Sequence, residues 1–250
     1  MKNFIISLFT ILLIISCKNE PHQVVKIEGK QLPVNQDIKS VKEIEDFIEP
    51  YKQKVAAEMN ATISYTPIDL VRTDGKLEST LGNLMADLCY QRSNPVFNSR
   101  TTKNIDFAMF NYGGIRAGIT KGAVTMENAF NLMPFENGLV VVELTADKVK
   151  ELVTYLIKSN RAHPLSKHIN LTINKDGYSL KINNKPLENN KTYFVLTSDY
   201  LQNGGDSMNF FKDPVSIINL DYKFRNAIID YFKETDTLKT KLDGRFKLEK

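Results

Sequence analysis

The segment 139–144 constrains the fold of this chain more than any other. It reads Leu-Val-Val-Val-Glu-Leu, which is rich in β-branched residues and almost continuously apolar. Such a run predicts a strand that is buried on both faces, inside a sheet covered on each side. A helix to about Ser159 is predicted directly after it, because apolar residues recur there at spacings of three and four.

The rest of the chain gives strand and helix signals in no regular order. Further helices are predicted from their apolar spacing and caps over 40–59, 78–91, from Thr125 onward, and 221–234. Further strands are predicted over 61–71, 105–110, 169–173, 178–182, 193–197 and 215–218. Pro50 predicts a break, a kink or a new helix start within the first helix. Because strands and helices mingle without regular alternation, we predict an α+β fold with a mixed sheet and packed helices.

The first 16 residues have the plan of a signal peptide, with a positive start and an apolar run from Phe4 to Ile15. The run is shorter than the roughly 20 apolar residues that span a bilayer. Ser16 followed by Cys17 resembles the lipobox of bacterial lipoproteins. The resemblance implies an exported protein with lipid on Cys17, anchored to the outer membrane on its periplasmic or surface side. The alternative is an ordinary secretory signal with an incidental cysteine.

This interpretation divides the chain into a signal peptide over 1–16, a polar tether over 17–37 and a domain over 38–250. The formal net charge of +4 falls to +3 when Lys2 leaves with the signal peptide. This mild surplus does not indicate a nucleic-acid partner, for which a clustered basic face would be typical. Cys89 lies in a helical pattern and is expected to be a buried small residue rather than a nucleophile.

Four short segments combine tight turns with polar or aromatic side chains, and they span 78–84, 111–116, 133–137 and 200–206. Adjacent glycines after a strand let the backbone turn sharply or approach a ligand closely. Arg116 directly follows such a turn, where its guanidinium could bind a phosphate or carboxylate. The carboxylate of Asp206 could accept two hydrogen bonds from a sugar diol.

Phe135 and Tyr200 are aromatic residues beside turns, outside the apolar stripes of the helices. Two such rings could enclose a planar base, at about 1–3 kcal/mol for each stacked face. Taken singly, each of the four segments is also explained as an ordinary turn, a core aromatic or a surface arginine.

Taken together, the four segments resemble the C-terminal domain of the 5′-nucleotidase family over about residues 40–250. This family includes bacterial periplasmic UDP-sugar hydrolases and the animal ecto-nucleotidase. The shared runs are Leu-Gly-Asn-Leu, Asn-x-Gly-Gly-Ile-Arg, Pro-Phe-x-Asn and Asn-Gly-Gly-Asp. The resemblance implies a nucleotide-recognition domain, preceded over 38–60 by a helix of the kind that links the family's two domains.

The resemblance also implies a substrate-binding role for Asn111, Gly113, Gly114, Arg116, Phe135, Asn137, Tyr200, Asn203 and Asp206. Phe135 and Tyr200 would stack on the base, Asp206 would hold the ribose, and Arg116 would reach toward phosphate and ribose. Asn111 and Asn137 would lie near the base and ribose.

Three other positions stay open at this point. Arg72 and Lys76 offer basic groups where family members bind phosphate. Where the family usually has Ser-Gly, this chain has Ser166 followed by Lys167 and His168. A side chain there could intrude on the base pocket, although His168 is also explained as a surface strand residue.

The family hydrolyses phosphate esters with two divalent metals, held by histidines, aspartates and an asparagine of an N-terminal metallophosphoesterase domain. The three histidines of this chain, His22, His163 and His168, lie in none of the corresponding patterns. We therefore expect no catalytic residue, metal site or cofactor in this chain, and no hydrolysis by the chain alone. The two metals are expected in a partner domain.

Three hypotheses follow. The chain is the nucleotide- or nucleoside-recognition half of a split 5′-nucleotidase, which acts in nucleotide catabolism with a separate metallophosphoesterase. Alternatively, it is a stand-alone lipoprotein that binds nucleosides or nucleotides. In the third hypothesis, the fold serves only as an interaction module and its pocket is dead.

Overall fold

The computed structural model describes residues 24–35 and 38–249, so the predicted signal peptide, Cys17 and part of the tether lie outside the described residues. A four-stranded sheet with the order β2-β8-β4-β9 forms the centre of the domain. Its strands are β2 (Phe107–Ala108), β8 (Thr192–Ser198), β4 (Gly138–Thr145) and β9 (Ser216–Lys223). β4 is antiparallel to β8 and β9, whereas β2 is parallel to β8.

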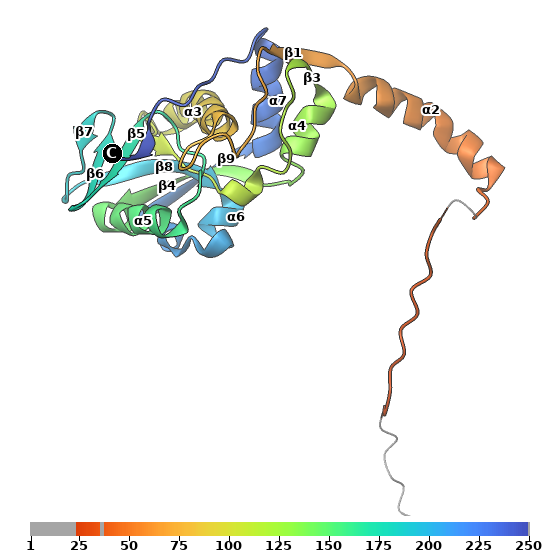
Figure 1. Cartoon of the computed structure of the whole chain (residues 1–250), viewed down its shortest axis with the longest axis horizontal. Coiled ribbons are helices and arrows are strands. Elements are labelled where there is room, and N and C mark those ends of the chain that lie inside the picture. The colour runs from red at the N-terminus through yellow and green to blue at the C-terminus, as the bar shows by residue number, and fades with distance from the viewer. Residues whose placement is uncertain (1–23, 36–37, 250) are drawn as a thin grey trace, which may run out of the picture. The chain divides into compact units, whose positions relative to one another are not determined.

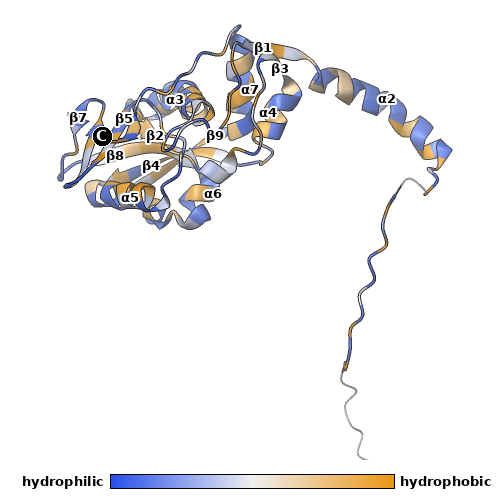
Figure 2. Ribbon diagram, viewed as in Figure 1, coloured by the Kyte–Doolittle hydropathy of each residue, from blue (hydrophilic) through white to orange (hydrophobic). Residues whose placement is uncertain are grey.

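Helices cover both faces of this sheet (Figure 1). α5 (Ala146–Ser159) and α6 (Asp199–Gln202) lie on one face, and α3 (Thr80–Thr101) and α7 (Phe224–Glu234) lie on the other. Val141 and Val142 point to opposite faces of β4, and they are 1 % and 0 % exposed. Apolar residues gather along the central strands, with hydrophilic residues on the outer helix faces (Figure 2). The predicted doubly buried strand and the α+β class are therefore confirmed.

Two smaller sheets complete the fold. β1 (Thr62–Thr66) pairs with β3 (Gly122–Thr125), which leads into α4 (Met126–Leu132). The other sheet has the order β10-β5-β6-β7, from β10 (Phe246–Leu248), β5 (Ile169–Asn174), β6 (Gly177–Ile182) and β7 (Lys185–Pro186). Arg245, which is 4 % exposed, donates to the carboxylates of Asp87 and Asp243. It thereby ties the end of the chain to α3.

The predicted helix caps at Thr125 and Thr145 are confirmed. The backbone N–H of Thr125 donates to the side-chain oxygen of Asn128 at 2.7 Å. The hydroxyl of Thr145 accepts from the backbone N–H of Lys148 at 3.4 Å. Cys89 is fully buried, and burial raises the pKa of its thiol well above the ordinary value. The thiolate that a nucleophile requires is thus strongly disfavoured there.

Several predicted boundaries were wrong. α2 (Lys42–Met59) runs through Pro50 without ending there, and α3 continues past Gln91 through Pro95. Packing explains the second case, because Phe97 in the added part is fully buried. Asp221 does not cap α7. It lies in β9 with φ of 52°, and α7 begins at Phe224. β1 and β2 are also shorter than the strands predicted over 61–71 and 105–110.

The described residues up to Ile48 and those from Glu49 onward belong to two separate units, and every element from β1 onward lies in the second. α2 has no buried residue. None of the helices in the described ranges is long and apolar enough to cross a membrane.

Candidate functional site

One edge of the central sheet carries a cavity of about 260 Å³. Its lining consists of Asn111, Gly113, Gly114, Arg116, Phe135, Asn137, Tyr200 and Asp206. β2 and β8 run parallel while β4 runs opposite to them. The chain therefore leaves β2 and β8 and enters β4 at the same edge of the sheet. This topology brings together residues from turns that are far apart in sequence. Of the nine residues predicted to bind substrate, all but Asn203 are part of the lining.

The carboxylate of Asp206 is held from two sides of the cavity. One oxygen accepts from the side-chain amide of Asn111 at 2.7 Å, and the other accepts from the hydroxyl of Tyr200 at 2.9 Å. The carbonyl of Asp206 accepts from the hydroxyl of Tyr155 at 3.0 Å. Asp206 has φ of 52°, an unfavourable region for a residue with a side chain. The three hydrogen bonds offset that strain and fix the direction of the carboxylate.

Tyr200 reaches Asp206 because Gly205 has no side chain. A Cβ at position 205 would lie 2.4 Å from Cε1 of the Tyr200 ring, closer than atoms can approach. The ring therefore lies directly against the backbone of this turn and remains 45 % exposed on its other side. The hydrogen bond to the Asp206 carboxylate raises the pKa of Tyr200, with a smaller contribution from burial. At neutral pH Tyr200 is thus a neutral donor to a charged acceptor.

The start of α7 holds the loop that presents Phe135. Arg225 donates to the carbonyls of Met133 and Phe135 at 3.3 and 3.4 Å, and it forms an ion pair with Glu136. The backbone N–H of Phe224 donates to the carbonyl of Asn137 at 2.9 Å. Phe135 is 41 % exposed, so its ring keeps surface that a ligand could cover. Sequence reasoning did not assign this supporting role to Arg225.

Arg116 lies close to the exposed ring of Phe135. Its guanidinium carbon is 5.9 Å from the ring centroid. The one hydrogen bond of its guanidinium within the described chain is to the carbonyl of Gly113, at the long distance of 3.5 Å. Most of its donors are therefore available to an anion beside the cavity.

Arg72 does not line this cavity. Its guanidinium donates to the carbonyls of Tyr112 and Ile115 at 3.2 and 2.6 Å, and it lies 4.5 Å from the centroid of the Tyr112 ring. Arg72 thus stabilises the turn Tyr112–Gly114 through these contacts. Together with Lys76 it belongs to a separate cavity.

Three other sequence expectations differ from the structure. The side chain of Asn203 donates to the carbonyl of Asp199 at 2.8 Å and so closes α6 instead of lining the cavity. Lys167 is exposed outside the lining, and its backbone N–H donates to Asp87. His168 is half-buried and stacks on Tyr90 at 3.7 Å between ring centroids, just before β5 begins. Neither side chain intrudes on the cavity, and His168 is not a surface strand residue.

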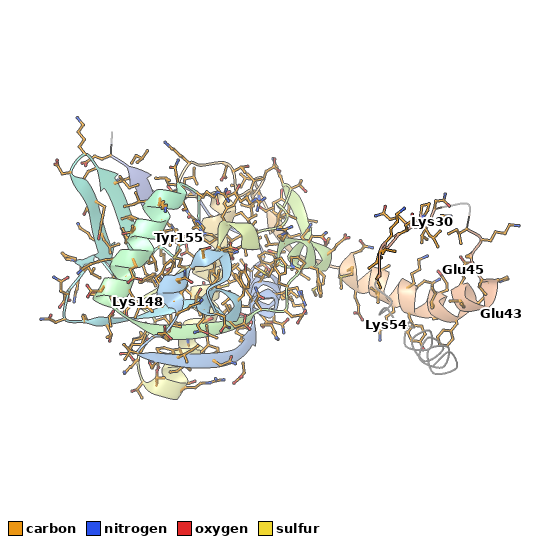
Figure 3. The ribbon with its side chains drawn as sticks, turned by 90° about the horizontal axis from the view of Figure 1, so that it is seen from below. Lys30, Glu43, Glu45, Lys54, Lys148 and Tyr155 are labelled. Carbon is orange, nitrogen blue, oxygen red and sulfur yellow. The ribbon has the colours of Figure 1, made fainter. Side chains whose placement is uncertain are left out.

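Tyr155 and His163 were not predicted as site residues. Tyr155 lies in the half of α5 away from Lys148 (Figure 3). Burial raises its pKa, as does the charge of Asp206. Tyr155 appeared in the sequence only as part of an ordinary helical pattern, and its contact with Asp206 spans 51 positions. No local signal could have identified it.

No group of three or more His, Cys, Asp or Glu side chains that could hold a metal occurs within residues 24–35 and 38–249.

A model of the family described as "5'-nucleotidase, C-terminal domain" matches residues 55–213. Among curated proteins, the trifunctional nucleotide phosphoesterase protein YfkN of Bacillus subtilis is 28 % identical over 86 % of this chain and 16 % of its own length. Protein UshA of Yersinia enterocolitica is 25 % identical over 75 % of this chain and 37 % of its own length.

Solved structures show the same fold. The 5′-nucleotidase precursor from Thermus thermophilus has a TM-score of 0.67 and 23 % identity, covering 83 % of this chain and 43 % of that structure. A putative 5′-nucleotidase from Staphylococcus aureus has a TM-score of 0.58 and 16 % identity, covering 90 % and 46 %. This chain thus spans less than half the length of each protein compared.

The bond between Tyr200 and Asp206 gives a testable titration. Ionising Tyr200 would break this bond and place a second negative charge beside Asp206. Asp206→Asn should therefore lower the pKa of Tyr200, measured by NMR titration of the ring signals. Asp176→Asn, at an exposed carboxylate in the turn between β5 and β6, should leave that pKa unchanged. Equal shifts in both variants would contradict the described contact.

Proposed function

This chain belongs to the 5′-nucleotidase family through its C-terminal domain, and on that premise we propose that it binds nucleosides or nucleotides in the cavity at the edge of the central sheet. The supporting observation is that the carboxylate of Asp206, fixed by two hydrogen bonds, lines the same cavity as two partly exposed aromatic residues, Phe135 and Tyr200. A carboxylate and two rings are complementary to the two halves of a nucleoside, a diol and a planar base.

Asp206 suits the ribose because its acceptor capacity is only partly used. A carboxylate has about four lone-pair sites, and Asn111 and Tyr200 occupy two of them. The ribose hydroxyls would donate to the remaining sites without any need to reorient the side chain. Such preorganisation lowers the entropic cost of binding.

Phe135 and Tyr200 suit the base because both rings keep exposed surface at the cavity. Stacking would remove that surface from water, at about 1–3 kcal/mol for each ring. Arg116 would then bind the phosphate of a nucleotide, since its guanidinium has free donors beside the same cavity.

Binding can be measured by calorimetric titration of the protein with adenosine and AMP. Phe135→Ala and Asp206→Ala should each weaken binding by about 1–3 kcal/mol, through lost stacking and lost hydrogen bonds to the ribose. Tyr178→Ala is the matched control, because Tyr178 is also a partly exposed aromatic residue but lies in β6. No binding of either ligand would favour an interaction module with a dead pocket.

We further propose that hydrolysis requires a separate metallophosphoesterase, with this chain as the recognition half. In this family the C-terminal domain is a nucleotide-binding domain that normally pairs with a metallophosphoesterase half. The chain matches less than half the length of each named relative. The alternative, a stand-alone binding lipoprotein, would need the same cavity but no such partner.

Reconstitution separates these two alternatives. A metallophosphoesterase that co-purifies with the chain should release phosphate from AMP about tenfold faster with the chain present than without it. Phe135→Ala should reduce this gain. Robust metal-dependent release of phosphate by the purified chain alone would contradict the proposal, and no gain with any partner would favour the stand-alone role.

Membrane attachment through lipid on Cys17 remains a proposal that rests on the sequence around it. Cys17→Ser should move the protein from the membrane fraction to the soluble fraction of cells, and it should abolish incorporation of labelled fatty acid. If this variant incorporates no labelled fatty acid but stays in the membrane fraction, the lipid interpretation is wrong.

A further inference from the structure

A second cavity, of about 530 Å³, adjoins the first at the turn Tyr112–Gly114. Gly113 and Asp206 line both cavities. The second one is distinguished by Arg161 and His163, which the first lacks. Neither residue belongs to the four segments that carry the family resemblance.

Positive charge dominates this region. Arg161 also lines an adjoining cavity of about 440 Å³, which contains Arg72 and Lys76. The guanidinium carbon of Arg161 lies 5.9 Å from the centroid of the Tyr112 ring, against 4.5 Å for Arg72. Asp206 is the acidic residue of these two linings, against the three basic residues Arg72, Lys76 and Arg161. The two cavities together therefore favour an anion.

His163 adds a buried donor to the cavity. The residue is 5 % exposed, and its Nδ1 accepts from the backbone N–H of Tyr112 at 3.1 Å. Burial lowers its pKa to about 4, although the nearby carbonyl of Phe110 and the charge of Asp206 partly oppose this. The ring is therefore neutral at pH 7. Because Nδ1 is the acceptor, its proton lies on Nε2.

This Nε2–H group has no acceptor in hydrogen-bonding geometry within the described parts of the chain. A buried donor without an acceptor costs about 1–3 kcal/mol. His163 lines the cavity, and a ligand acceptor that reaches the covered Nε2 atom would remove that cost. The ring is held in place by the bond to Tyr112 and by its contact with Tyr155, at 5.4 Å between centroids.

We propose that this second cavity binds a phosphate-class oxyanion, with His163 Nε2–H and the guanidinium of Arg161 as its donors. A tetrahedral oxyanion presents several acceptor oxygens, so it can satisfy a neutral imidazole and a charged guanidinium together. The anion is either free phosphate or a phosphoryl group of a nucleotide that also contacts the first cavity. The site does not depend on nucleoside binding in the first cavity.

The test is titration of the full chain with inorganic phosphate at constant ionic strength, followed by calorimetry and by the side-chain ¹⁵N signals of histidine. Arg161→Gln should weaken phosphate binding about tenfold, as expected for loss of a charge-assisted hydrogen bond. Lys158→Gln is the control, since it removes the same charge from an exposed position in α5. Its effect should stay below about twofold.

His163→Phe keeps a ring against Tyr155 but removes the donor, and it should weaken phosphate binding to a similar extent. In the wild-type protein, the Nε2 signal of His163 should shift with phosphate and not with chloride. If His163→Phe does not fold, Arg161→Gln and the Nε2 signal still decide the question.

Comparison of AMP with adenosine identifies the source of the anion. If a nucleotide supplies it, AMP binds more tightly than adenosine, and Arg161→Gln reduces this difference while Lys158→Gln does not. If free phosphate is the ligand, it binds in the absence of a nucleoside. Phe135→Ala then leaves phosphate binding unchanged and weakens the binding of adenosine. Two results would overturn the proposal. The first is that phosphate does not bind and that any tighter binding of AMP than of adenosine is independent of Arg161. The second is that Lys158→Gln and Arg161→Gln weaken phosphate binding equally.

Discussion

The carboxylate of Asp206 joins two turns that lie 95 positions apart in the sequence, through its hydrogen bond to Asn111. A second bond, to Tyr200, fixes one of the two exposed rings, and Gly205 makes room for that ring. The carboxylate can occupy this position because Tyr155 holds the backbone of Asp206 from α5. The geometry of the cavity depends on this network more than on any single contact in the core.

The sequence predicted the α+β class, and the family resemblance drew attention to eight residues that line one cavity. The turns that contain Gly113 and Gly205 have local signatures, and each follows or precedes a strand of the central sheet. The sequence could not show which residues hold these turns in place. Tyr155 and Arg225 lie in helices whose patterns look ordinary, and their roles arise from contacts across the fold. Local patterns carry no information about such long-range contacts.

Contacts across the fold also explain where other side chains lie. Asn203 is adjacent to the predicted glycine pair, and its side chain satisfies the end of α6. His168 could not be placed from the sequence, because its stacking partner Tyr90 lies in α3. α2 runs through Pro50 and α3 runs through Pro95, and for α3 the burial of Phe97 shows that tertiary packing overrides the local preference. In these cases tertiary contacts, and not the local sequence, determine the structure.

The central claim is that a nucleoside binds with its base at Phe135 and Tyr200, and its most direct test is an NMR measurement of contacts between ligand and protein. We predict nuclear Overhauser effects from the base protons of adenosine to the ring protons of both residues. Specific binding of adenosine with contacts to neither ring would contradict the account and would place the nucleoside elsewhere on the domain.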